Sequence, residues 1–262
     1  MSGTRPLRAA TLYPLSGIAC GDDANGTALV RRATRRDIDL THRVVQDGEP
    51  VPDADVYLLG GRGTAHLAAL VARLSDGDTL RTRVGEGAAV LAVDAGLDAL
   101  GHGVAEAGDV SVSGLGLLDV TTRRGPLRDT ALVTTPAPDL ALPSLVGWVQ
   151  TDLVLTPGPA YRPFAALELG EGDVGTAEGA VAGRVLGTRL HGPLLAVNPE
   201  VADLLLAWAT GQDPHDLAPL DDTLAHEARR RRITAELDAR QTGSDSVVTR
   251  LAPRFRERRA RA

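Results

Sequence analysis

The amino-acid sequence predicts an α/β fold with an open, mostly parallel sheet flanked by helices and a β-rich segment around residues 132–189. In the first half of the chain, short apolar runs alternate with segments of helical periodicity, which is typical of parallel strands joined by crossover helices. Beyond residue 132, short segments separated by six prolines are more consistent with hairpins and loops than with helices.

Three strand, turn and helix units are expected in order. The predicted strands are Ala9–Leu15, Asp55–Leu59 and Ala88–Val93. The segments with helical spacing that follow them are Thr27–Arg36, His66–Leu74 and a short helix that ends at Leu100. Because runs of this length need crossovers to pair in parallel, the helices should cover both faces of the sheet.

A further helix and a basic tail complete the chain. Asn198-Pro199-Glu200 has the residues that open a helix, and Gly211 should end it. Residues 221–262 hold 11 arginines against 7 acidic residues, which predicts a basic helix with a frayed end. The basic face is either simply solvated or a contact for an acidic partner surface. We expect one domain over residues 1–240 and a flexible Arg-rich tail over 241–262.

Composition narrows the possible functions. The 262 residues carry a net charge of -6, which argues against non-specific nucleic-acid binding. The single cysteine, Cys20, excludes an intramolecular disulfide and a cysteine-based zinc site, and it fits a reducing compartment. No apolar run approaches the roughly 20 residues of a membrane span, and the histidines show no metal-ligand spacing. We therefore expect a cytoplasmic protein without metal or cofactor.

Candidate site residues follow the predicted strands, where α/β sheets bind ligands. Gly60 and Gly61 follow one strand, and their amides could face an anion or simply permit a positive φ. Asp94 occupies the sharp strand-to-helix corner at which a nucleophile elbow would lie. His191 lies before a Gly-Pro pair and is either a general base or a hydrogen-bonded loop histidine.

Taken together, these segments resemble class I glutamine amidotransferase domains of the cobyric-acid-synthase-like branch, and within it the GatD-type subunits. GatD-type subunits work with the Mur-ligase-like MurT to amidate the peptide glutamate of lipid II. The resemblance covers most of residues 9–235. Its pieces, in chain order, are Leu12-Tyr13-Pro14, Gly21 to Asn25, Asp53 to Asp55 with Gly60-Gly61, Val90 to Gly101, Gly114 to Asp119 with Thr122 and Arg128, Gly187 to Leu195, Asn198-Pro199 with Ala202-Asp203, and Leu217 to Asp222.

The resemblance implies a flavodoxin-like fold and a cysteine nucleophile at the elbow, where this chain has Asp94. The glutamine of the family's Cys-Gly-Gly-Tyr-Gln segment falls on Asp98. A Gly-Phe-Glu-Asn-His-Gly-like segment is replaced by residues 147–152, Gly-Trp-Val-Gln-Thr-Asp. His191 is retained, and so is Arg128, whose counterpart faces the substrate. Arg128 therefore indicates an anionic ligand or, alternatively, a surface ion pair.

Three functions are consistent with this pattern. The leading hypothesis is a GatD-like subunit that pairs with a MurT or other Mur-ligase-like partner but does not hydrolyse glutamine, because a carboxylate is a poor attacker of an amide and repels the oxyanion. The second is a repurposed hydrolase or transferase that uses Asp94, Asp98 and His191 on another substrate. The third is a still-active subunit of lipid II isoglutaminyl synthase.

Overall fold

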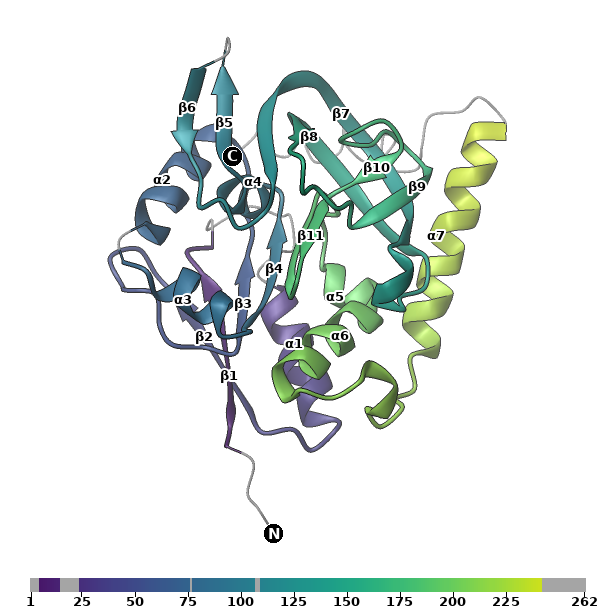
Figure 1. The fold of residues 1–262 in the computed structure, drawn as a ribbon. Coiled ribbons are helices and arrows are strands. Elements are labelled where there is room, and N and C mark those ends of the chain that lie inside the picture. The colour runs from purple at the N-terminus through teal and green to yellow at the C-terminus, as the bar shows by residue number, and fades with distance from the viewer. Residues whose placement is uncertain (1–4, 15–23, 76, 107–108, 242–262) are drawn as a thin grey trace, which may run out of the picture.

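The computed structural model describes residues 5–14, 24–75, 77–106 and 109–241, which form two β-sheets and the helices around them (Figure 1). Cys20 and residues 242–262 of the predicted tail lie outside the described residues. Mixed sheets flanked by helices confirm the predicted α/β class.

The first sheet has the strand order β11-β12-β4-β3-β1-β2. All neighbours are parallel except β11, which runs antiparallel to β12. The strands are β1 (Leu7–Leu12), β2 (Leu40–Val45), β3 (Val56–Leu59), β4 (Ala89–Val93), β11 (Ala180–Ala182) and β12 (Val185–Thr188). The three predicted strands correspond to β1, β3 and β4. The edge strand β2 was not predicted, because only one of its six residues is buried and the strand gives no apolar run.

Helices cover both faces of this sheet, as predicted. Alternate residues of β4 point to opposite sides, so that Leu91 packs with one hydrophobic core and Val90 with the other. The first core contains α1 (Ala24–Thr34), α5 (Leu194–Val197) and α6 (Pro199–Thr210). The second contains α2 (Thr64–Leu74), α3 (Thr79–Gly85) and α4 (Ala95–Leu100). The site at the carboxyl end of β4 is therefore supported from both sides.

The second sheet has the order β10-β9-β7-β5-β6, with β8 paired to β7. Its strands are β5 (Gly103–Glu106), β6 (Asp109–Ser113), β7 (Val120–Pro136), β8 (Leu145–Pro157), β9 (Ala165–Leu169) and β10 (Ala177–Glu178). It begins at Gly103, earlier than the predicted boundary near residue 132. The first half of β7 is rich in arginine and threonine and contains Gly125-Pro126, so it lacks a strand-like apolar pattern.

The C-terminal helices agree with the sequence prediction in position. Gly211 ends α6 in the left-handed conformation, with φ 71°. The basic helix is α7 (Thr223–Gln241), which contacts α5 and β8. It is not solvated all round, because Arg229 is buried and pairs with Glu200 of α6 at 2.8 Å. Among the described helices, none is both long enough and apolar enough to cross a membrane.

Candidate functional site

Asp94 occupies a strained elbow between β4 and α4. Its backbone has φ 47° and ψ -106°, a combination that a residue with a side chain rarely adopts and that costs on the order of 1–3 kcal/mol. Its amide donates to the carbonyl oxygen of Thr188 at 2.9 Å, which ties the elbow to β12. The side chain is buried rather than presented to solvent.

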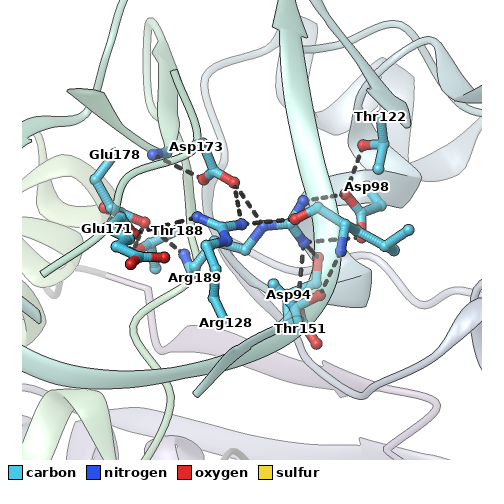
Figure 2. Close-up of polar contacts among 12 residues, drawn as sticks. Asp94, Asp98, Thr122, Arg128, Thr151, Glu171, Asp173, Glu178, Thr188 and Arg189 are labelled. Carbon is cyan, nitrogen blue, oxygen red and sulfur yellow. Dashed lines mark hydrogen bonds and ion pairs between the residues drawn. The ribbon is translucent and has the colours of Figure 1, made fainter. Parts of the chain in front are cut away.

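Arg189, the residue after β12, fills the space beside this elbow (Figure 2). Its guanidinium is fully buried and donates to both oxygens of Asp98, at 2.6 and 2.9 Å. It also donates to Oδ1 of Asp94 at 2.9 Å. Asp98 lies one helical turn after Asp94, on α4, and its Oδ1 accepts a further hydrogen bond from Thr122 Oγ1 at 2.6 Å. Both predicted carboxylates are thus bound to one arginine.

A third carboxylate connects this group to the second sheet. Asp173 lies in the turn between β9 and β10, and its side chain is not exposed. Its Oδ1 accepts from Arg128 Nη2 at 2.8 Å and from Arg189 Nε at 3.3 Å. Arg128, on β7, is itself buried and also donates to the carbonyl oxygen of Leu153 at 2.6 Å. We call Arg128, Arg189, Asp94, Asp98 and Asp173 the arginine–aspartate cluster (Figure 2).

Glu178 borders the cluster from β10. Its Oε1 accepts from the backbone amide of Arg189 at 2.6 Å and from Thr188 Oγ1 at 3.0 Å. Complete burial, with the nearby charge of Asp173, raises the pKa of Glu178 to about 7. These bonds fix the backbone at the point where β12 turns toward His191.

The two carboxylates on Arg189 differ in their proton affinity. Burial opposes ionisation of both, but the hydrogen bond from His191 and the charge of Arg189 hold the pKa of Asp94 below its usual value. For Asp98 burial outweighs the stabilisation by Arg189, so its pKa is raised. We therefore treat Asp94 as the more firmly ionised of the pair.

His191 lies beside Asp94. Its Nε2 is 3.3 Å from Asp94 Oδ2, and the imidazole is buried. The backbone amide of His191 donates to the carbonyl oxygen of Trp148 on β8 at 2.8 Å, which holds the loop against the second sheet. The segment 147–152 therefore contacts the site through its backbone.

The glycine turn that follows β3 directs the carbonyl group of Gly61 at the elbow. The amide of Ala95, the residue after Asp94, donates to the carbonyl oxygen of Gly61 at 3.2 Å. The ring of His66 covers Gly61, because a Cβ there would lie 2.3 Å from it, and His66 Nε2 is 3.3 Å from the carbonyl oxygen of Gly60. The Ala95 amide, which an elbow could direct at an oxyanion, is engaged within the protein.

The structure thus brings Asp94, Asp98, His191 and Gly61 together and links Arg128 to them through Asp173. Sequence reasoning missed Arg189, Asp173 and Glu178. A signal for Arg189 was present, since an arginine between Thr188 and Leu190 interrupts an otherwise apolar run that leaves a buried strand. Among the described residues, no group of three or more His, Cys, Asp or Glu side chains could hold a metal ion.

Comparisons with known proteins identify the family of the chain. Residues 32–199 match the CobB/CobQ-like glutamine amidotransferase domain. The chain is 35% identical over 175 residues to cobyric acid synthase of Sphingopyxis alaskensis, across 63% of this chain and 34% of that protein. It is 28% identical over 196 residues to the GatD subunit of lipid II isoglutaminyl synthase (glutamine-hydrolyzing) of Staphylococcus aureus, across 72% of this chain and 78% of GatD.

Two solved structures share the fold. A chain in the structure of PurLQS from Thermotoga maritima superposes with a TM-score of 0.56 at 15% identity, over 78% of this chain and 99% of that one. A glutamine amidotransferase from the same organism superposes with a TM-score of 0.51 at 11% identity, over 87% and 93%.

The matched domain is more than half of the chain, so the protein belongs to the CobB/CobQ-like glutamine amidotransferase family. The match spans about a third of the length of cobyric acid synthase but most of the length of GatD. A GatD-like glutamine amidotransferase subunit is the assignment that these relatives support.

Proposed function

We propose that this protein is a GatD-like subunit that pairs with a MurT or other Mur-ligase-like partner and has no glutaminase activity. The observation that carries the proposal is the state of Asp94. It occupies the strained elbow, where we place the nucleophile of the family, and its carboxylate is bound to Arg189 instead of facing a substrate. The pairing with a Mur-ligase-like protein in peptidoglycan precursor amidation rests on the likeness to GatD.

The chemistry of glutamine hydrolysis explains why Asp94 should be inactive. The reaction needs a nucleophile that attacks the carboxamide carbon, donors for the oxyanion, and a group that moves protons. His191 could move protons. A carboxylate is a much weaker attacker than a thiolate, and the charge of Asp94 would lie next to the developing oxyanion. The Ala95 amide is already bonded to Gly61.

A repurposed hydrolase or transferase is a second candidate, and one observation favours it. The imidazole of His191 lies 3.3 Å from the ionised Asp94, a pair capable of acid–base chemistry. Against it, Asp98 is held by Arg189 and Thr122, and Asp94 is held by Arg189, so neither carboxylate is presented to a ligand. We therefore place the non-hydrolysing subunit first.

The proposal is tested by purifying the protein with a Mur-ligase-like protein of the same organism and following both complex formation and glutamate release. We expect a stable heterodimer on size-exclusion chromatography and no glutamate from glutamine. A protein that remains separate would overturn the partner assignment. Glutamate release that His191→Ala abolishes would overturn the inactive site.

A further inference from the structure

We propose that Arg128 and Arg189 form a carboxylate-binding site that the protein closes with its own Asp173. The inference rests on the proposed function, because it concerns how the same site is closed to ligands. It adds a two-arginine receptor, a chemical class of ligand, and an internal occupant.

Asp173 is the residue on which the two arginines converge. A single oxygen, Oδ1, accepts from Arg128 Nη2 at 2.8 Å and from Arg189 Nε at 3.3 Å. None of the three side chains is more than 3% exposed. Two guanidinium groups directed at one carboxylate are the arrangement by which proteins bind carboxylate ligands, because the donors are fixed in planar forks.

The two arginines are held without Asp173. Arg189 has Asp98 and Asp94 as further ionic partners, and Arg128 donates to the carbonyl oxygen of Leu153 on β8 at 2.6 Å. Arg128 also donates to the carbonyl oxygen of Glu171, in the same turn as Asp173, at 3.3 Å. In the part of the chain that the structure describes, Asp173 is the one carboxylate paired with Arg128. Removing Asp173 should therefore leave Arg128 in place with an unbalanced buried charge, which is the condition for taking up a free carboxylate.

Asp173 is supplied by a surface turn. Residues 170–176 read Gly-Glu-Gly-Asp-Val-Gly-Thr, and Gly170 and Gly175 have positive φ. Asp173 N donates to Ala177 O at 3.0 Å, and Ala177 N donates to Val174 O at 2.9 Å. The turn is also held by β9, through Leu167 N donating to Thr176 O at 2.7 Å, and by Arg128, which donates to Glu171 O. Glu171 and Thr176 are exposed while Asp173 is buried, so the turn directs a single acid inward. It can be altered without interrupting a strand of the first sheet.

The test is chemical rescue of Asp173→Ala by sodium acetate, followed by thermal unfolding. We expect the substitution to lower Tm by on the order of 10 °C, and acetate at tens of millimolar to restore at least half of the loss. Sodium chloride at equal ionic strength and neutral acetamide should not restore it. Acetate should leave the wild-type Tm unchanged, because Asp173 already occupies the site.

Two further variants define the outcome. Adding Arg128→Met to Asp173→Ala should abolish the acetate effect. Asp152→Ala, which removes the partner of the exposed Arg124, is a matched control that acetate should not affect. Equal rescue by acetamide, or acetate stabilisation of the control, would overturn the proposal.

If Asp173→Ala does not fold, the isosteric Asp173→Asn is combined with Arg128→Met in a double-mutant cycle. The proposal expects Tm losses that are clearly less than additive, and additive losses would overturn it. None of these readouts uses glutamine, so they can fail while the proposed function stands, and the reverse also holds.

Discussion

The guanidinium of Arg189 donates to both carboxylate oxygens of Asp98, at 2.6 and 2.9 Å, and both side chains are fully buried. The same guanidinium reaches Asp94 at the elbow and Asp173 from the second sheet. One arginine therefore binds both carboxylates at the positions where the family resemblance implies a nucleophile and a glutamine. Asp94 and Asp98 thus share one cation inside the protein.

Arg189→Met should be strongly destabilising. Burying ions is costly, and removing one partner leaves the others buried with an uncompensated charge, which typically costs about 3–5 kcal/mol. We expect a loss of this size in the free energy of unfolding, measured by urea denaturation. Arg230→Met is the control, because Arg230 is exposed on α7, and its effect should lie within about 0.5 kcal/mol. Similar stability of the two variants would contradict the importance of the cluster.

Thr122→Val should lower the free energy of unfolding, because the neutral hydroxyl of Thr122 stabilises Asp98 in addition to Arg189. Thr122 Oγ1 donates to Asp98 Oδ1 at 2.6 Å inside the protein. A hydrogen bond to a charged group contributes about 1.5–3 kcal/mol, and we expect a loss in that range. Thr234→Val, at an exposed position of α7, is the matched control. In the Asp98→Asn background the effect of Thr122→Val should shrink, because an amide oxygen is a weaker acceptor than a carboxylate, and an unchanged effect would show that the charge of Asp98 does not strengthen the bond.

Glu178 should make stability fall as the pH rises toward neutrality. Because burial raises the pKa of Glu178 to about 7 in the folded protein, above its ordinary value of 4.5, the native state binds the proton more tightly than the unfolded chain. Its contribution to the free energy of unfolding is present below about pH 4.5 and is lost as the pH rises through about 7, with a total of roughly 3 kcal/mol.

The difference in unfolding free energy between wild type and Glu178→Gln should therefore change between pH 5 and pH 7.5, with the wild type losing stability relative to the variant. The measurement is a series of urea denaturation curves across that range. A difference that stays constant with pH would mean that the Glu178 carboxyl titrates at its ordinary pKa.

Gly61→Ala should destabilise the glycine turn. Gly61 has φ 111°, and an added Cβ would lie 2.3 Å from the ring of His66. We expect a loss of about 1–3 kcal/mol, because both the backbone conformation and the contact are unfavourable. Adding His66→Ala should restore the stability lost through the contact with the ring, but not the stability lost through the unfavourable backbone conformation. The measurement is differential scanning calorimetry of the single and double variants. Full recovery of stability in the double variant would show that the positive φ of Gly61 is unimportant.

Much of the first sheet was predictable from local pattern. The strands β1, β3 and β4 are buried on both faces, so each appears in the sequence as an apolar run followed by a turn. The start of the second sheet was not predictable in this way. The antiparallel strands β7 and β8 follow one another in the chain, but the first half of β7 is polar and contains Gly125-Pro126, so it gives no strand-like apolar pattern.

The candidate site was predictable only in part. Asp94 and His191 follow strands whose carboxyl ends meet at one edge of the sheet, and the structure places them 3.3 Å apart. Arg189 was missed because its partners Asp94 and Asp98 lie more than 90 positions earlier in the chain, and no local pattern indicates such a pairing. Asp173 was missed because a glycine-rich turn usually directs its acids to solvent.

We propose that Asp94 leaves this protein without glutaminase activity. The most direct test is a glutaminase assay on the purified protein, alone and with its Mur-ligase-like partner, beside a hydrolysing member of the family as positive control. We expect no glutamate above background in either condition. Glutamate release from the wild type that is lost in both Asp94→Asn and His191→Ala would contradict it.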